Sequence, residues 1–442
     1  VLGAFVKLTV DLQGQPMSLV YRLYQQEGDW PPASQTVMYP LVEREAAVRQ
    51  RRVFFPSNGQ LIPATDTWYT QEKPHALIQQ VTDEQGHTLL RRHRETHLTD
   101  TSGWGYVFMP DPITPLNQSY GGVYVNANDS DVPELNAERV TRPLRDLTFV
   151  NGSYRLQGPY VSLENIDAPF VPQETSQNGD FFFTRAQQGF EQVNVYFHID
   201  SMQRYIRSLS FLNLVNWPLR VDAHGFSGAD NSAYYANPDS PQQAYLLFGE
   251  GGVDDAEDAD VIIHEYIHAV SDAASPQSNT GFARRGLDEG YADYFAVSYS
   301  RGLNDHDFRK VFHWDGHNPF WPGRTLDDTR QYNPTMFNNF YELGAYWGTA
   351  LLDASLITGK TITDRVALQA LYGSFPDMNM VDAAEAMLEA DTLLYGGQYS
   401  PNYLWVFCNR GLINDGRCAL ASSREGEGLP IAQKPLLVWP NP

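Results

Sequence analysis

The chain has 442 residues, of which 42% are apolar and 19% charged, a balance typical of globular rather than disordered proteins. The length favours two or three domains, each able to bury its own core. The formal net charge of -22 argues against nucleic acid and anionic membrane as partners. No apolar run is long enough to predict a membrane span, and the first ten residues lack the basic segment of a signal peptide. Composition gives no indication of an oligomeric state.

The first third of the chain has the pattern of β structure. Apolar and polar residues alternate at 4–12, 17–26 and 75–93, which predicts strands. The "DEQG" inside the last of these segments predicts a hairpin turn. Irregular connections rich in Pro and Asn follow, so we expect a β-rich region over residues 1–145.

From about residue 185 the periodicity becomes helical. A long segment at 186–211 has helical spacing, and 242–252 has the pattern of a strand that ends in a glycine turn. Further helices, each bounded by Gly, Pro or Asn, are expected at 256–274, 288–301, 338–358, 364–372, 381–395 and 401–410. The expected fold class is α+β, in three parts: a β-rich region at 1–145, a mixed α/β region at 146–275 and a helical region at 276–442.

The segment "DVIIHEYIHAVSD" at 260–272 carries the main functional signal. Residues four apart lie on one face of a helix, so His264 and His268 would direct their imidazoles at one point, as two zinc ligands require. Glu265 lies one step round the helix, where it can hold a water rather than the ion itself. The alternative is a chance pattern on a solvated face, since the chain contains 11 histidines.

Two acids in "GLDEGYADYFAV" favour the zinc interpretation. A Gly-containing turn after His268 would let a second helix bring Glu289 to the open side of the two histidines. Asp293, four residues later on the same face, is placed to accept the N–H of a liganding histidine. The alternative for both acids is a solvated helix face.

Three protein ligands leave a fourth position for water, which is the catalytic pattern of zinc sites. Glu265 would take a proton as that water attacks a carbonyl carbon and deliver it to the leaving nitrogen. The expected reaction is therefore hydrolysis of an amide bond.

"HEYIH" together with "LDEGYADYF" resembles the gluzincin metallopeptidases of thermolysin and fungalysin type. The resemblance extends over about residues 185–415 and includes "NSAYYAN", "GRTLDDTRQYNP" and "YELGAYWGTALLDA". It implies a two-lobed zincin catalytic domain with a helical C-terminal lobe. It also implies that His264, His268 and Glu289 bind zinc. Glu265 would then be the general base, and Asp293 would orient a liganding histidine. The hairpin around "VTDEQGHTLLRRH" faintly resembles the pro-domains of the same group.

The resemblance implies further contacts with a peptide substrate. The strand containing Ala233 and Tyr234 would pair with the substrate backbone, as in β-augmentation. Arg324 stands where the family carries a substrate-binding arginine.

The sequence departs from the family where an oxyanion-stabilising histidine is expected. Tyr341 occupies that position, and Met336 occupies that of the supporting acid. A tyrosine hydroxyl stays protonated near neutral pH and can donate to an oxyanion, but a packed aromatic with no role is an equal alternative. His313 and His317 are candidate substitutes, although each is more typical of a loop histidine.

Calcium is the weaker cofactor expectation beside zinc. Asp260 matches one acid of the family's double calcium site, but Ser300 stands where a later acid is expected. Cys408 and Cys418 lie close together near the C-terminus and are expected to form a disulfide, which suits a secreted or cell-surface protein.

The expected function is a secreted zinc-dependent endopeptidase, acting on protein or peptide substrates with Glu265 as the general base. An alternative is a non-catalytic binding or adhesion protein built on a metallopeptidase fold. Only the departure at Tyr341 favours this alternative, and the presence of Glu265 argues against it. A third possibility, an aminopeptidase, ranks last because no acidic motif for binding an N-terminus precedes the zinc helix.

Overall fold

The computed structural model contains two compact units, Val1–Thr101 and Ser102–Pro442. The residues that it describes are 5–10, 16–22, 47–57, 60–72, 75–94 and 101–422. Two strands that precede residue 145, β7 (Gly103–Val107) and β8 (Val140–Leu144), pair with each other inside the second unit. The three-part division expected from the sequence stays a prediction.

The described part of the first unit consists of antiparallel strands. A two-stranded ribbon and a four-stranded sheet in the order β3-β4-β5-β6 make it up. In the turn between β5 and β6, Asp83 Oδ1 accepts hydrogen bonds from the backbone of Gln85 and His87, and Gly86 has a φ of 86°. The expected hairpin is therefore confirmed. The strands are β1 (Phe5–Val10), β2 (Pro16–Arg22), β3 (Ala47–Ser57), β4 (Gln60–Glu72), β5 (His75–Asp83) and β6 (Thr88–Arg94).

The second unit contains several small sheets. Its four-stranded sheet has the order β11-β14-β16-β15, with β15 (Ser232–Tyr235) antiparallel to β16 at one edge. The strand and glycine turn expected at 242–252 are present as β16 and the loop after it. The remaining strands are β9 (Thr148–Val150), β10 (Ser153–Arg155), β11 (Val161–Leu163), β12 (Thr175–Ser176), β13 (Asp180–Phe181), β14 (Leu219–Asp222), β16 (Tyr245–Phe248), β17 (Lys310–Val311) and β18 (Arg324–Thr325).

The helices of the second unit follow the expected series. The largest differences are at α4, which begins at Phe282 rather than near 288, and at the short α1 and α9, which the sequence did not indicate. Gly281, with a φ of 85°, precedes α4 directly and allows the chain to enter the helix that early. The helices are α1 (Pro133–Ala137), α2 (Gly189–Ser208), α3 (Ala259–Ala274), α4 (Phe282–Leu303), α5 (Phe340–Thr358), α6 (Lys360–Leu371), α7 (Met380–Tyr395), α8 (Ser400–Asn409) and α9 (Arg417–Ser422).

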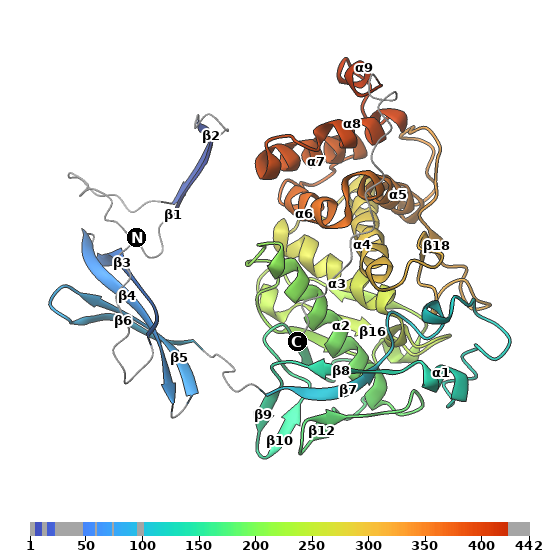
Figure 1. Ribbon diagram of the computed structural model, residues 1–442, viewed down its shortest axis with the longest axis horizontal. Coiled ribbons are helices and arrows are strands. Elements are labelled where there is room, and N and C mark those ends of the chain that lie inside the picture. The colour runs from blue at the N-terminus through green and yellow to red at the C-terminus, as the bar shows by residue number, and fades with distance from the viewer. Residues whose placement is uncertain are drawn as a thin grey trace. The chain divides into compact units, whose positions relative to one another are not determined.

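Within this unit, helices and strands are segregated. Figure 1 shows α6, α7 and α8 at one end, strands β7–β10 and β12 at the other, and α2, α3 and α4 between them. One hydrophobic core cluster includes residues from Val107 to Ile413 and the apolar faces of these central helices. The mixed α and β character expected from the sequence is therefore confirmed.

A close contact between α4 and α5 brings the start of α5 to the middle of α4. A Cβ atom added at Gly344 of α5 would lie 2.6 Å from the Cβ of Glu289 on α4, which is too close for any side chain. The glycine therefore sets the distance between Glu289 and the N-terminal turn of α5.

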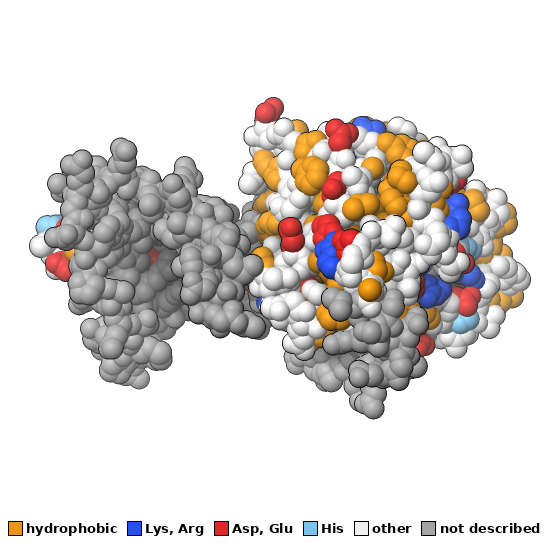
Figure 2. All heavy atoms as spheres, turned by 90° about the horizontal axis from the view of Figure 1, so that it is seen from above, with side chains coloured by type: hydrophobic (Ala, Val, Ile, Leu, Met, Phe, Trp, Pro, Cys, Tyr) orange, Lys and Arg blue, Asp and Glu red, His pale blue; other side chains and the backbone are white. Residues whose placement is uncertain are grey.

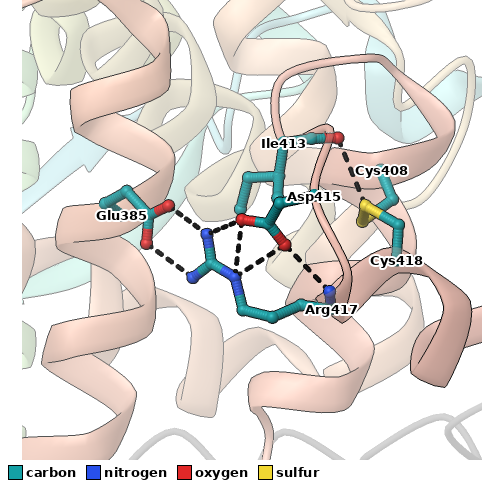
Figure 3. Close-up of a disulfide and its surroundings, with 6 residues drawn as sticks. All are labelled: Glu385, Cys408, Ile413, Asp415, Arg417 and Cys418. Carbon is teal, nitrogen blue, oxygen red and sulfur yellow. Dashed lines mark hydrogen bonds and ion pairs between the residues drawn. A yellow bond between two sulfur atoms is a disulfide. The ribbon is translucent and has the colours of Figure 1, made fainter.

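Cys408, near the end of α8, and Cys418, in α9, form the expected disulfide, with their Cα atoms 5.6 Å apart. Beside it, the Arg417 guanidinium lies between the carboxylates of Asp415 and Glu385, the latter on α7 (Figure 3). The disulfide and this ion-pair group together attach α9 to α7 and α8.

The described surface carries mixed side chains. On the face shown in Figure 2, hydrophobic, acidic and basic side chains lie interspersed over the second unit. Among the described helices, none combines the length and apolar character that crossing a membrane would require.

Candidate active site

The two histidines of the sequence motif lie on one face of α3. The helix begins after Asp258, whose side chain accepts a hydrogen bond from the backbone N–H of Asp260. Its apolar residues are buried, which fixes the orientation of the helix in the core. The Nε2 atoms of His264 and His268 lie 3.2 Å apart, as the four-residue spacing predicts.

Glu289 of α4 completes this group of side chains. Its Oε2 lies 3.3 Å from His264 Nε2, and its Oε1 lies 3.8 Å from His268 Nε2. These three residues are one of two groups among the described residues whose donor atoms lie close enough together to hold a metal ion. The structure thus brings together the three expected ligands.

The opposite ring nitrogens of both histidines are held by carboxylates. His264 Nδ1 lies 2.9 Å from Asp293 Oδ1, and His268 Nδ1 lies 2.6 Å from Asp288 Oδ2. The contact of Asp293 agrees with the sequence expectation, whereas Asp288 was not foreseen. Asp288 is itself held by Arg284 and Asn279, each at 3.0 Å.

This arrangement fits a zinc ion. Tetrahedral zinc with ligands at ordinary distances separates neighbouring donor atoms by about 3.3 Å, close to the separations of His264 Nε2 from its two neighbours. Carboxylates on Nδ1 leave Nε2 of each histidine free to bind a metal. Glu289 Oε2 is buried and has no hydrogen-bond partner among the described residues.

The electrostatics of the group also favour a cation. Burial alone would lower the pKa of His268, but the negative charges of Asp288 and Glu289 outweigh burial and raise it to about 10. Burial would raise the pKa of Glu289, yet the nearby imidazoles of His264 and His268 lower it. The surrounding acids therefore stabilise positive charge at this point, which a divalent cation would also supply.

Glu265 lies beside the candidate metal ligands and lines the same cavity. Its side chain is buried, and burial raises the pKa of the carboxyl above its usual value, although nearby His264 and His268 oppose the shift. A carboxylate with a raised pKa is better suited to hold a proton transiently, as a general base must.

A cavity of about 950 Å³ opens over these residues. Ala233 and Tyr234 of the edge strand β15 line one wall, and the Tyr234 hydroxyl donates to Asp272 of α3 at 2.9 Å. Arg324 and Tyr341 also line the cavity. Among the described strands β15 lies at the edge of its sheet, and such an edge beside the candidate metal ligands can accept an extended peptide through backbone hydrogen bonds.

Arg324 forms a two-pronged ion pair with Asp293, at 2.8 Å from Nε and 2.7 Å from Nη2. Its guanidinium also lies 4.7 Å from the centre of the Phe312 ring and 5.5 Å from that of Tyr341. Asp293 therefore connects Arg324 to His264, and Arg324 faces the cavity beside the candidate metal ligands.

Tyr341 is 47% exposed, so its ring is only partly packed, and the role of its hydroxyl stays a prediction. It lies in the first turn of α5 with its ring 4.3 Å from that of Phe340. Met336, by contrast, packs against the hydrophobic core.

The two alternative histidines do not line the cavity formed by described residues. Nε2 of His317 lies 3.1 Å from the carbonyl oxygens of Val311 and Arg324, so this histidine braces its own loop. His313 lies 3.8 Å from Asp260 Oδ2.

The proposed calcium ligand Asp260 is engaged by protein groups. One oxygen accepts the Ser300 hydroxyl and the other accepts the backbone N–H of Phe312 at 2.9 Å. Burial opposes charge on His313, but Asp260, Asp111 and Asp258 outweigh it and raise the His313 pKa to about 9. Positive charge at this position thus comes from the chain itself, and calcium content stays untested.

No known protein-family model matches the chain. It is, however, similar to fungal proteins named extracellular metalloproteinases. The MEP protein of Fusarium vanettenii is 27% identical over 248 residues, which cover 45% of this chain and 38% of that protein. The mep protein of Aspergillus fumigatus is 24% identical over 257 residues, which cover 47% of this chain and 38% of that protein.

A third relative, extracellular metalloproteinase 3 of Trichophyton tonsurans, is 23% identical over 336 residues, which cover 63% of this chain and 50% of that protein. The matches thus cover half or less of the length of each of these relatives. They confirm the resemblance to metallopeptidases of fungalysin type that the zinc motif indicated.

Proposed function

We propose that the chain is a secreted zinc endopeptidase with a two-lobed zincin catalytic domain. The observation that carries the proposal is the convergence of two histidine Nε2 atoms and the Glu289 carboxylate, with both Nδ1 atoms held by carboxylates. The extracellular metalloproteinases to which the chain is similar support both the reaction and the secretion.

His264, His268 and Glu289 would hold the zinc. When bound, zinc supplies Lewis acidity, which lowers the pKa of water and polarises a carbonyl group. The carboxylates of Asp288 and Asp293 keep the two imidazoles in the tautomer and orientation that this binding needs.

Glu265 acts as the general base in this proposal. Its carboxylate accepts a proton from the attacking water and passes it to the leaving nitrogen, so that an amide bond is replaced by a carboxylate and an amine. The edge strand β15, through Ala233 and Tyr234, holds the substrate backbone in an extended form. Tyr341 and Arg324 face the same cavity and are the donors available to the carbonyl oxygen as negative charge develops there.

The test combines metal content with cleavage of a peptide blocked at both ends. Zinc-loaded protein should contain one zinc per chain and cut this peptide, which an aminopeptidase cannot do. Glu265→Gln should keep the zinc and lose about 10²–10⁴-fold in kcat, because it removes the proton acceptor but keeps the shape.

Glu342→Gln is the matched control, because it removes a carboxylate from the same cavity outside the metal group. Undiminished turnover in Glu265→Gln would rule out this mechanism. Zinc-loaded protein that cuts no peptide would instead favour a binding protein on a metallopeptidase fold.

A further inference from the structure

A second group of carboxylates lies in the same cavity. Asp230 precedes β15, Asp255 begins the short helix η4 (Asp255–Glu257) before α3, and Asp315 lies in the loop that leads to Arg324. All three line the cavity, and each offers an oxygen within 4.8 Å of the others. Three segments that are distant in sequence therefore bring three acids to one wall of the cavity.

Among the described residues, no basic side chain forms an ion pair with these acids, although the positive charge of Arg324 acts on Asp315 in the direction that lowers its pKa. Asp255 and Asp315 are only 2% and 5% exposed, and one oxygen of each is buried without a hydrogen bond. Burial, together with their mutual repulsion, raises the pKa of both carboxyls well above its usual value. Because a buried, unpaired carboxylate is costly, the group is suited to a positively charged ligand.

The backbone around the acids is closely packed. In the glycine turn after β16, a Cβ at Gly251 would lie 2.3 Å from the backbone nitrogen of Asp230. The Ser232 hydroxyl of β15 donates to the second oxygen of Asp255. The acids are thus fixed relative to the strand along which a peptide substrate would run.

The group also lies close to the proposed general base. The negative charge of Glu265 contributes to the raised pKa of Asp255, and both residues line the cavity. A peptide bound at β15 and cut beside Glu265 would therefore lie in the same cavity as the three acids.

We propose that Asp230, Asp255 and Asp315 form a specificity pocket for a lysine or arginine side chain next to the cleaved bond. The inference rests on the proposed function and adds the substrate class. A lysine ammonium has three N–H donors, one for each carboxylate. Calcium usually takes six to eight oxygen ligands, about twice what the three acids offer singly, so we favour the organic cation.

The experiment uses pairs of peptides that are blocked at both ends. The two members of a pair differ at one position near the cut, which is lysine in one and norleucine in the other, and each position is tested in turn. At one position, zinc-loaded protein should cleave the lysine peptide with a kcat/KM roughly tenfold or more above that of the norleucine peptide. The position that shows this preference also identifies the side of the cleaved bond on which the pocket lies.

Asp315→Asn and Asp255→Asn should each reduce this preference, while cleavage of the norleucine peptide is retained. Asp230→Asn serves as a second test in case a buried variant does not fold, because Asp230 is exposed. Glu342→Gln should keep the full preference, although it removes the same charge from the same cavity. A preference that falls equally in Glu342→Gln would mean that general charge, rather than a pocket, is responsible.

Two results would overturn the inference without affecting the peptidase. One is cleavage of norleucine peptides as fast as lysine peptides at every position. The other is one tightly bound calcium per chain that EGTA removes and Asp315→Asn loses, since the acids would then form a metal site.

If the wild-type protein cuts neither peptide, the proposed function fails. The pocket can then still be tested by measuring how tightly each peptide binds. Calorimetry on Glu265→Gln should show tighter binding of the lysine peptide. Equal binding of the two peptides would overturn the pocket.

Discussion

Each histidine of the candidate metal site is held by a different carboxylate of α4. Asp293 contacts His264 and could be anticipated, because it lies one helical turn after Glu289. Asp288 contacts His268, and this contact could not be anticipated, because Asp288 lies directly before Glu289 and therefore points to another side of α4. Only the packing of α4 against α3 determines which acid meets which histidine.

At the scale of single residues, the third ligand gives a direct prediction. Glu289→Ala should lower zinc occupancy sharply, because it removes the one charged ligand and leaves two neutral imidazoles. Zinc per chain, measured by elemental analysis after dialysis against metal-free buffer, checks this. Glu342→Gln, treated in the same way, should keep its zinc. Full zinc content in Glu289→Ala would show that the metal is held by other residues.

The hydroxyl of Tyr341 gives a second prediction at this scale. If it donates to the developing oxyanion, Tyr341→Phe should lower kcat by an amount approaching 10²–10³-fold, about the cost of losing one such donor. KM, zinc content and melting temperature should change little, because the side chain is half exposed and the ring is kept. Undiminished kcat would mean that the hydroxyl is idle and that Arg324 is the remaining candidate donor.

At the scale of elements, the loop at 311–315 is attached to the first turn of α3. Asp258 Oδ2 accepts the backbone N–H groups of Trp314 and Asp315, each at 3.0 Å. Asp260 accepts that of Phe312. His313 then places a positive charge among the acids that make these contacts. The attachment matters for the site, because this loop carries Asp315 and leads to Arg324.

The attachment predicts a pH-dependent stability. The pKa of His313 is about 9 in the folded protein against an ordinary value of 6.5. Its contribution is therefore fully present below about pH 6.5 and is lost as the pH rises through about 9. The melting temperature of His313→Gln should fall furthest below wild type near pH 6, and the difference should shrink towards pH 10.

His306→Gln is the control for this measurement, because His306 lies a few residues upstream and is more exposed. It should lower the melting temperature little at either pH. A deficit in His313→Gln that is the same at both pH values would contradict the ionic attachment and indicate lost packing alone.

The helices and strands were largely predictable from the sequence, whereas the contacts between them were not. Helical periodicity and Gly, Pro or Asn boundaries placed α3, α5 and α7 within a few residues of their observed bounds, because these signals are local. The expected role of β15 in pairing with a substrate came only from the resemblance to a family. The acids at 230, 255 and 315 were missed, since no local pattern brings three such distant residues together.

At the scale of the whole molecule, the proposed metal ligands, the proposed general base and the proposed substrate-binding residues all lie in the unit that begins at Ser102. The large hydrophobic core cluster likewise starts at Val107 and includes β7 and β8. The sequence alone placed the end of the first region near residue 145, because the β-rich pattern and the irregular Pro- and Asn-rich connections after it end there. These two positions make different predictions about which part of the chain folds alone.

A chain of residues 102–442 should therefore fold, bind zinc and cut the doubly blocked peptide, whereas one of residues 146–442 should not fold. The second chain lacks β7 and β8 and the segment after β7. In the intact unit the backbone N–H of Phe108 donates to Asn194 at 3.1 Å, and its carbonyl accepts from His198 of α2 at 3.0 Å. Without that segment these buried polar groups on α2 lose their partners, which costs free energy for each one.

The two boundaries are distinguished by measuring thermal melts by circular dichroism and zinc content. Both shortened chains are measured beside the full chain. A cooperative melt and bound zinc in residues 146–442 would move the boundary to residue 145. Loss of both in residues 102–442 would show that the second unit depends on the strands before Thr101 for its stability. If those strands act like the pro-domains that their hairpin faintly resembles, kcat/KM of residues 102–442 should exceed that of the full chain, because a pro-domain restrains the active site until it is removed.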